Sequence, residues 1–515
     1  GGVAADSDAT AEAQERAAVE AFQAGEALLG SGDAGKAVAC FMRAASALPG
    51  WPDAWLRLGV SLHHLRRYEQ ACSAMRHGLQ VCAWEELPAI LTYMDTLREI
   101  GRLSDVLAAA ERVPPASPFG HFAALLAGWA AHAAGDAAAA ERWFAGAAAA
   151  EPGNPLYTYL RARAAARGGP CDFTPPADLQ ATFEDDAVLA KLHRAQHHLD
   201  VPGLRAVNDK VSLHRLLTAA EVLDGAAFWP RGYVLPGDLA RAEAEEEEAV
   251  SGLPASGLPR WVRKSRNGMG GLGVTVHSSV AGAAKAGQQE RGPEEEESLL
   301  QAYVQPPVLL EGRKFSLRTF LVLYVGAPTP GGLAGYVAHE GLALMATQPL
   351  VAGVGAEEQD GALGAHVTNQ SAAQQATPEE DLTRDVATLP DSALAGWPGG
   401  ADALWRAIEA VAAGLLAAGR ASILEPVGEF VPEQTVLVPK VLGLDVLLSA
   451  ESAGQPARAW LLEVNRHPSL GERYACARRV KRRVVMDAWR LLWEHGGSSG
   501  EAAWPATCGC LRRIA

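Results

Sequence analysis

Small and apolar side chains recur at a fixed spacing through the first 165 residues. Five positions reappear 103 residues later, so that Gly32, Ala37, Phe41, Ala44 and Pro49 are followed by Gly135, Ala140, Phe144, Ala147 and Pro152. Between them, Gly59, Ala71 and Gly78 lie 34 residues after Gly25, Ala37 and Ala44. A period of about 34 predicts paired antiparallel helices that meet at small residues. The third repeat, about Trp84–Ser117, departs from the pattern, with Asp105 where alanine is expected. A plain helical bundle with coincidental spacing is the alternative.

Alternation of apolar and polar positions replaces this spacing after about residue 200. Runs such as Phe320–Val325 and Trp460–Val464 predict β-strands, and Ala401–Ala418 predicts a helix. The Gly- and Pro-rich stretch Gly168–Pro176 marks a boundary. We therefore expect a disordered N-terminus (1–16), helical repeats (17–165), a linker (166–199), an α+β domain (200–495) and a C-terminal tail (496–515). Within the domain, Glu245–Glu248 and Glu294–Glu297 are expected to be solvated insertions, and Gly353–Ser392 a mobile loop.

Composition and charge narrow the class of protein. Of the 515 residues, 49% are apolar and 20% charged, which excludes a disordered or fibrous chain. The formal net charge of −15 argues against nucleic-acid binding, which depends on neutralising phosphates. Seven scattered cysteines indicate a reducing compartment rather than a disulfide framework. No apolar run approaches the roughly 20 residues of a membrane span, so none is expected.

Two cationic segments are candidates for phosphate binding. Arg260–Val274 has the pattern of strand, Gly-rich turn and strand, with Lys264 at the end of the first strand. Glycines let main-chain N–H groups approach an anion, although a Gly-rich hairpin beside a surface lysine would look the same. On the strand that begins near Gly312, Lys314 and Arg318 share one face, and apolar residues take the other. Such a face suits a polyphosphate; a solvated sheet face is the alternative.

A pair of predicted strands brings two carboxylates together. Leu442–Leu448 and Ala459–Asn465 would form a hairpin centred near Gly454, which places Asp445 opposite Glu463 and puts Asn465 on the same face as Glu463. Directly opposed like charges destabilise a sheet, and a divalent cation between them reverses that effect. Carboxylate and amide oxygens are hard ligands suited to Mg²⁺. An exposed polar hairpin face is the alternative.

These motifs, in this order, resemble the tubulin tyrosine ligase-like family of ATP-grasp enzymes over about residues 200–490. Further matching stretches are Val207–Leu213, Phe228–Pro236, His339–Leu342, His366–Ser371 and Asn465–Leu470. The first 165 residues resemble tetratricopeptide repeats, which would bind a protein or peptide partner. The resemblance implies an α+β ATP-grasp domain that uses ATP and one or two Mg²⁺ ions to join an amino acid to a protein carboxylate through an acyl-phosphate. Glutamate added to tubulin tails or another acidic protein is the expected reaction, with tyrosine or glycine as alternatives, in the cytoplasm at the cytoskeleton, cilium or basal body.

The resemblance also implies a role for individual residues. Catalytic roles fall to Lys264, Arg318 and Glu463. The nucleotide would be bound by Lys210, Lys264, Gly271, Gly273, Gln301, Tyr303, Val304, Lys314 and Arg318. Thr368 and Asn369 would lie on the acceptor or amino-acid side, and Asp445, Glu463 and Asn465 would ligate Mg²⁺.

The chain departs from the family's pattern at several positions. Ser265 follows Lys264 where the family has proline, Leu272 replaces an arginine between two glycines, and Ala302 replaces a lysine in the hinge. Leu344 stands where an arginine is expected to touch phosphate or the incoming carboxylate. Loss of one such contact costs about 2–4 kcal/mol of transition-state stabilisation, roughly 10²–10³ in rate, unless the nearby His339 compensates. A weakened or inactive relative that serves as a scaffold through its repeats is therefore the alternative function.

Overall fold

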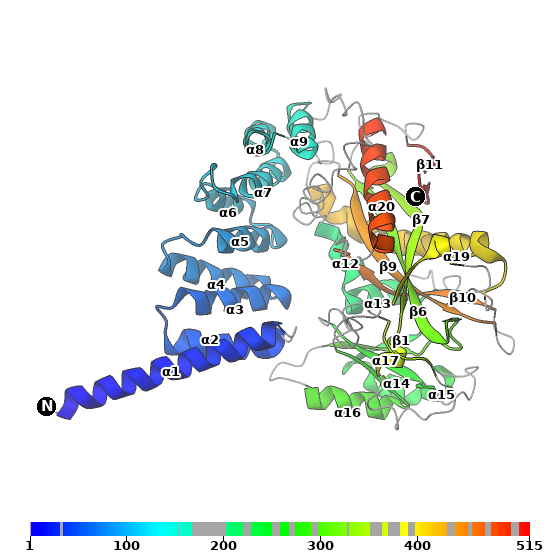
Figure 1. The fold of residues 1–515 in the computed structure, drawn as a ribbon, viewed down its shortest axis with the longest axis horizontal. Coiled ribbons are helices and arrows are strands. Elements are labelled where there is room, and N and C mark those ends of the chain that lie inside the picture. Colours follow the sequence, from blue (N-terminus) through cyan, green and yellow to red (C-terminus); the bar gives the residue numbers. More distant parts are fainter. Residues whose placement is uncertain are drawn as a thin grey trace. The chain divides into compact units, whose positions relative to one another are not determined.

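The chain forms two compact units, Gly1–Thr174 and Pro175–Ala515, in a computed structural model (Figure 1). The structure describes residues 2–30, 34–152, 154–166, 202–219, 228–249, 258–266, 273–290, 297–326, 329–350, 363–368, 382–389, 397–429, 438–451, 456–468, 475–495 and 504–515. The expected linker therefore lies almost wholly outside the described residues, as does most of Gly353–Ser392.

The described part of the first unit is all helical. Its helices are α1 (Gly2–Gly30), α2 (Ala34–Ala47), α3 (Pro52–His64), α4 (Tyr68–Val81), α5 (Leu87–Glu99), α6 (Leu103–Ala110), α7 (Gly120–Ala133), α8 (Ala137–Ala150) and α9 (Pro155–Ala166). From α2 onward, every second helix begins 33 to 35 residues after its predecessor, which confirms the period of about 34. The irregular third repeat contains the shortest of these helices, α6, with eight residues.

Several glycines in this unit, Gly25 and Gly128 among them, lie where neighbouring helices touch. A Cβ on Gly25 would come within 2.7 Å of the Phe41 ring, and a Cβ on Gly128 within 2.6 Å of the Phe144 ring. The two contacts are equivalent, 103 residues apart, so the repeated small residues are explained by close helix packing. Residues 2–16, for which disorder is expected from the sequence, form the first half of α1, and the alanines of this segment favour a helix.

The described part of the second unit contains two antiparallel sheets. The small sheet has the order β1 (Gly232–Leu235), β4 (Ser298–Ala302), β2 (Trp261–Ser265) and β3 (Val274–His277). The large sheet has the order β10 (Arg458–Asn465), β9 (Lys440–Ser449), β6 (Arg313–Val325), β7 (Leu333–Met345), β12 (Leu511–Arg513) and β11 (Thr507–Cys508). In addition, β5 (Leu309–Leu310) pairs with β6, and β8 (Thr383–Asp385) with β7. Short helices accompany these strands, namely α12 (Arg205–Asn208), α13 (Lys210–Ala219), α14 (Leu239–Ala244), α15 (Glu246–Ala249), α16 (Val280–Glu290) and α17 (Leu363–His366).

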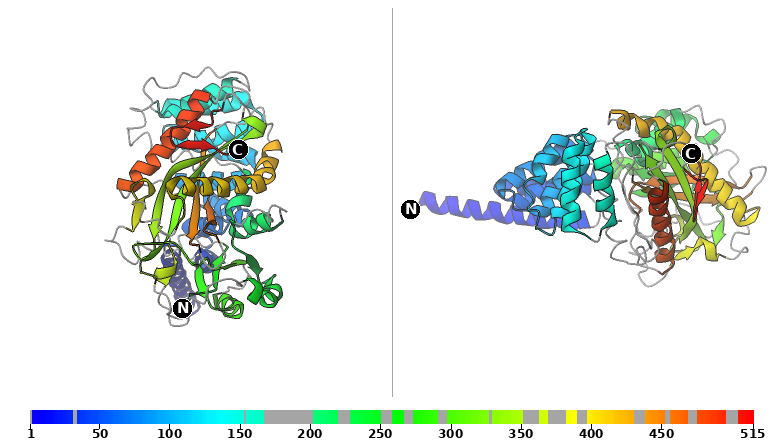
Figure 2. Two further views of the ribbon diagram at one scale, coloured as in Figure 1. Left: turned by 90° about the vertical axis from the view of Figure 1, so that its right-hand side faces the viewer. Right: turned by 90° about the horizontal axis from the view of Figure 1, so that it is seen from above.

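Long helices cover both faces of the large sheet (Figures 1 and 2). On one face, α19 (Gly400–Glu429) packs residues such as Leu404 and Leu415 against Leu317 and Leu444 of the strands. On the other face, α20 (Ala475–His495) contacts β7 and β8, and the Tyr324 hydroxyl donates to the main-chain oxygen of Ala488 at 2.6 Å. The same face at the start of β6, with Lys314 and Ser316, lines a pocket together with strands of the small sheet.

One described helix segment, Gly400–Leu424 within α19, is long and apolar enough to cross a membrane by length and composition. It carries core residues, among them Ile408 and Leu415, which are fully buried against the large sheet. A core helix of a globular domain meets the same criterion, so the packing of α19 accounts for its apolar sequence.

The C-terminal residues belong to the domain, which corrects the expected tail. Leu511 pairs with Ala338 of β7, so residues 504–515 extend the large sheet. The fully buried Asp487 of α20 accepts a hydrogen bond from the main-chain N–H of Cys510 at 2.8 Å and pairs with Arg483. The two strands, Thr507–Cys508 and Leu511–Arg513, are too short to give a periodic signal in the sequence.

The acidic runs are only partly solvated insertions. The Glu246 carboxylate accepts hydrogen bonds from the Trp261 indole at 3.0 Å and from the main-chain N–H of Val280 at 2.9 Å, at the start of α16. In the second run, Glu297 forms an ion pair with Arg266 at 2.7 Å. Both carboxylates therefore tie elements of the small sheet together, a role that a run of like charges in the sequence does not reveal.

Candidate functional site

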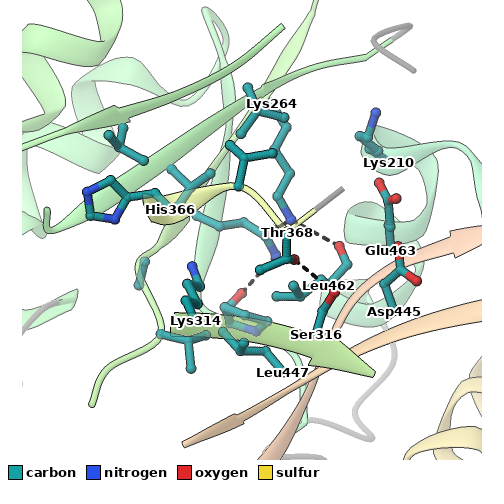
Figure 3. A pocket seen from close by; sticks show the side chains of 18 residues that line it. Lys210, Lys264, Lys314, Ser316, His366, Thr368, Asp445, Leu447, Leu462 and Glu463 are labelled. Atoms are coloured by element: carbon teal, nitrogen blue, oxygen red, sulfur yellow. Dashed lines mark hydrogen bonds between the residues drawn. The ribbon is translucent and has the colours of Figure 1, made fainter. Parts of the chain in front are cut away.

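A pocket lies between the two sheets of the second unit (Figure 3). Its volume is about 880 Å³, counting the space at its open mouth. The structure brings eight of the predicted site residues to its wall: Lys210, Lys264, Gln301, Val304, Lys314, Thr368, Asp445 and Glu463. These residues come from segments more than 250 positions apart, so the fold rather than local sequence assembles the site.

The small sheet contributes an apolar wall with a charge at its edge. Val262 and Lys264 lie two residues apart on β2, as Val274 and Val276 do on β3, and all four line the pocket. Their neighbour Trp261 points to the other face, into the core of the small sheet. The valines escaped the sequence analysis. The spacing of two from Lys264 would have found Val262, and the pairing of Lys264 with Val274 and of Val262 with Val276 places the other two on the same face.

Lys264 is held by groups from both sheets. Its Nζ donates to Oε1 of Gln301 on β4 at 2.8 Å and to the main-chain oxygen of Leu462 on β10 at 3.0 Å. Burial lowers the pKa of Lys264 to about 8, against the opposing attraction of Glu463. Because both hydrogen-bond acceptors are neutral, the ammonium group retains its charge for an anion in the pocket.

Lys314 is a second buried cation, on β6. Its Nζ lies 4.1 Å from the centre of the Tyr303 ring, and burial, followed by repulsion from Lys264, lowers the pKa of Lys314 to about 7. Tyr303 is 1% exposed and shares a hydrogen bond of 2.9 Å with Nδ1 of His366. Tyr303 does not line the pocket, in contrast to its expected contact with the nucleotide. It supports Lys314 and His366 from behind the wall.

Ser316 and Thr368 close the wall beside Lys314. The Thr368 hydroxyl donates to Oγ of Ser316 at 2.8 Å, which ties the segment after α17 to β6 (Figure 3). His366, the last residue of α17, also lines the pocket, a contact that the sequence analysis did not predict. Burial lowers the pKa of His366 to about 4, so its imidazole is neutral near pH 7.

Asp445 and Glu463 are paired across β9 and β10, as predicted. Asn465 follows on the same face, opposite Gly443. The Asn465 amide donates to Oδ2 of Asp445 at 3.3 Å and to Oε1 of Glu463 at 3.4 Å. Both carboxylates therefore converge on one amide group. Their side chains lie close together at the pocket (Figure 3).

Each of the two carboxylates has its own cation. Arg318 lies on β6, the neighbour of β9 on the side away from β10, and is paired with Asp445. Its guanidinium donates to both carboxylate oxygens of Asp445, from Nε to Oδ1 and from Nη2 to Oδ2, the latter at 2.9 Å. Burial raises the pKa of Asp445 to about 6, with Arg318 acting in the other direction. Burial also acts to raise the pKa of Glu463, but Lys210 and its other polar neighbours hold this pKa below its ordinary value.

The donor set fits a divalent cation with a polyphosphate. The carboxylates of Asp445 and Glu463 and the amide group of Asn465 lie next to one another. Carboxylate and amide oxygens are ligands that Mg²⁺ prefers. Among the residues that the structure describes, no three or more His, Cys, Asp or Glu side chains form a group that could hold a metal ion by themselves. A metal at Asp445 and Glu463 would therefore take its remaining ligands from phosphate and water, as Mg²⁺ does in nucleotide sites.

Other predicted site residues lie elsewhere. Arg318 was expected to hold phosphate, but it is bound to Asp445 and does not line the pocket. Gly273 has φ +69°, and its main-chain oxygen accepts from the N–H of Ser265 at 2.8 Å; it shapes the turn rather than the wall. Gly271, Leu272 and Asn369 fall outside the described residues.

Two departures from the family's pattern have a clear structural setting. Leu344 stands opposite Ser316 in the pairing of β7 with β6 and is 3% exposed, so an apolar residue occupies the pocket-side face there. His339 cannot compensate, which corrects that expectation. Its Nε2 lies 2.6 Å from Oε1 of Glu409 on α19, and its ring stacks on Trp405.

Two sheets that close on buried lysines and facing carboxylates are the arrangement expected of a domain of the ATP-dependent ligase class. The sequence model of the Tubulin-tyrosine ligase family matches residues 189–493, more than half of the chain. The chain therefore belongs to this family, whose members use ATP, generally with Mg²⁺.

Curated relatives are distant. The human tubulin polyglutamylase TTLL7 is 24% identical over 318 residues, which cover 59% of this chain and 33% of that protein. The mouse tubulin polyglutamylase TTLL11 is 26% identical over 150 residues, 29% of this chain and 19% of that protein. The chain thus spans about a third or less of the length of these relatives.

Proposed function

We propose that residues 200–495 form an ATP-grasp ligase that uses ATP and Mg²⁺ to attach an amino acid to a protein carboxylate. The observation that carries this proposal is the convergence of Lys264, Lys314, Asp445 and Glu463 on one pocket. Buried ammonium groups match a polyphosphate, and opposed carboxylates match the metal that accompanies it. Family membership supports the same reaction class.

The chemistry proceeds through charge stabilisation rather than a strong base. The acceptor carboxylate attacks the terminal phosphorus of ATP, ADP leaves, and the resulting acyl-phosphate is attacked by the amine of the incoming amino acid with release of phosphate. Lys264 and Lys314 stabilise the negative charge on the transferred phosphoryl group. Asp445, Glu463 and Asn465 would hold Mg²⁺, which neutralises phosphate charge and orients the polyphosphate.

We further propose glutamate as the amino acid and tubulin tails, or another acidic protein, as the acceptor. The names of the relatives support this choice, since both are tubulin polyglutamylases. The cations of the pocket would also attract an acidic polypeptide, although the whole chain carries a net charge of −15. This substrate implies a cytoplasmic protein at the cytoskeleton, cilium or basal body. Its helical unit, with repeats of tetratricopeptide type, would bind a protein or peptide partner.

Incorporation of labelled glutamate, glycine or tyrosine into tubulin tests the proposal. Glutamate should be incorporated in an ATP- and Mg²⁺-dependent reaction, and Glu463→Gln should abolish it without loss of the fold. Glu451→Gln is the matched control, because Glu451 is exposed just beyond the end of β9. Unchanged incorporation by the Glu463→Gln variant would refute the assigned site.

A scaffold without ligase activity is the second candidate, and Leu344 favours it. The buried leucine occupies the pocket-side face where a cation is expected. A protein that retains the fold but not the nucleotide would show no rise in its melting temperature with millimolar Mg²⁺–ATP, whereas a ligase would show a rise.

A further inference from the structure

Arg318 is engaged with Asp445 rather than with the pocket. The two residues face each other on β6 and β9, and the guanidinium donates to both carboxylate oxygens, through Nε to Oδ1 and through Nη2 to Oδ2 at 2.9 Å. The side chains are 15% and 9% exposed. A bidentate guanidinium fixes the plane of a carboxylate, and a partly buried pair of this kind is strongly held.

The neighbouring strand position leaves room for this contact. Gly443 lies two residues before Asp445 on β9, and a Cβ there would stand 3.0 Å from Cδ of Arg318, 3.0 Å from Cβ of Pro468 and 3.4 Å from Cβ of Asn465. Glycine weakens a strand interior and often marks a close approach by another group. Here two groups approach, the ring of Pro468 and the methylene stem of Arg318, whose guanidinium reaches Asp445.

The cations around the pocket therefore divide into two sets. Lys264 and Lys314 line the pocket, with ammonium groups that hydrogen-bond neutral oxygens or lie over a ring. Arg318 lies behind the pocket, on the far side of Asp445 from Glu463 in the strand order β10, β9, β6. A carboxylate has about four lone-pair positions, so Asp445 retains acceptor capacity after Arg318 has used two.

We propose that Arg318 is a positioning residue for Asp445 and not a ligand of the nucleotide phosphates. This proposal rests on the proposed function. Arg318 sets the orientation in which Asp445, beside Glu463 and Asn465, receives a divalent cation. Lysine cannot replace it, because a single ammonium group does not hold both carboxylate oxygens in one plane. Gly443 serves the same end by keeping the path of the Arg318 side chain open.

Binding of Mn²⁺, as a probe for Mg²⁺, tests the proposal through electron paramagnetic resonance in the presence of ATP. The dissociation constant of Mn²⁺ should rise about 10- to 100-fold in Arg318→Lys, the loss typical when a partner of a metal ligand is removed. The affinity for ATP measured in EDTA should stay within about twofold, because Lys264 and Lys314 remain. Arg479→Lys is the matched control, since it breaks a bidentate pair with Glu340 that lies outside the pocket.

Two further variants keep the test decisive if Arg318→Lys folds poorly. Gly443→Ala should weaken Mn²⁺ binding by pressing on the Arg318 stem. In an Asp445→Asn background, Arg318→Lys should cost no further Mn²⁺ affinity, as expected when one residue acts through the other. Loss of metal-free ATP affinity with unchanged Mn²⁺ affinity in Arg318→Lys would overturn the proposal. Failure of the wild-type protein to bind either Mn²⁺ or ATP would instead overturn the proposed function.

Discussion

Asp445 and Glu463 face each other because the pairing of β9 with β10 shifts by one residue after Leu461. In the register that Leu461 keeps with Val446, Asp445 would stand opposite Leu462. Leu462 is the extra residue of this β-bulge, and its main-chain oxygen accepts the hydrogen bond from Lys264 at 3.0 Å. A bulge re-aims side chains next to active sites. One irregularity thus aligns the carboxylates and anchors a lysine.

The affinity for ATP should fall as the pH rises through 7. Burial lowers the pKa of Lys314 to about 7, and a polyphosphate attracts only the protonated form. We expect a fall of roughly 10-fold between pH 6.5 and 8.5, measured by equilibrium binding in EDTA. Lys314→Arg, which stays charged, should remove most of this dependence. The same steep dependence in the arginine variant would contradict the role of Lys314.

The stability of the ligand-free protein should rise with pH, in contrast to its affinity for ATP. The folded pKa of Lys314 lies below its ordinary value of 10.5, so the unfolded chain binds more protons between pH 7 and 10. The contribution of this lysine to the free energy of unfolding therefore rises with pH across that window. Denaturant titrations at pH 7 and 9 give the free energy of unfolding of the wild type and of Lys314→Met. The contribution of Lys314 is the difference between the two proteins in the gain of this free energy from pH 7 to 9. A smaller gain for the wild type than for Lys314→Met would contradict the burial of the charge.

Leu344→Arg should increase ligation by about 10- to 100-fold. Leu344 stands opposite Ser316 on the pocket-side face, where a guanidinium would add a charge-assisted contact to the reacting groups. Rates of ATP-dependent amino-acid incorporation measure the effect, and Leu344→Met is the control of similar volume. If the arginine variant folds and its rate equals that of the methionine variant, the missing charge does not limit the reaction.

Helix packing in the first unit predicts that alanine substitutions of two glycines on adjacent helices change the stability of the protein in opposite directions. Gly128→Ala should lower the free energy of unfolding by about 1–3 kcal/mol, because its Cβ would press on the Phe144 ring at 2.6 Å. Gly146→Ala, with no atom within 4 Å of the new Cβ, should raise it by about 0.5–1 kcal/mol. Denaturant unfolding of the full chain measures both, and equal effects would argue against the close contact of α7 with α8.

Periodic features of the fold could be predicted from the sequence, and irregular ones could not. The 34-residue period and the alternation along β6 come from regular helices and strands, whose side chains repeat in space. The partner of Arg318 depends on which strand lies beside β6, and the strands at residues 504–515 depend on a long-range pairing with β7. Neither leaves a local signal. The opposition of Asp445 and Glu463 was predicted from a regular hairpin, although it is the bulge after Leu461 that produces it.

The measurement that tests the central claim most directly is calorimetric titration of the protein with ATP, with and without Mg²⁺. The account predicts that Mg²⁺ strengthens ATP binding to the wild type, and that Glu463→Gln binds ATP with the same affinity whether or not Mg²⁺ is present. The account would be contradicted if the wild type binds no nucleotide at millimolar concentration, or if Glu463→Gln retains the full effect of Mg²⁺.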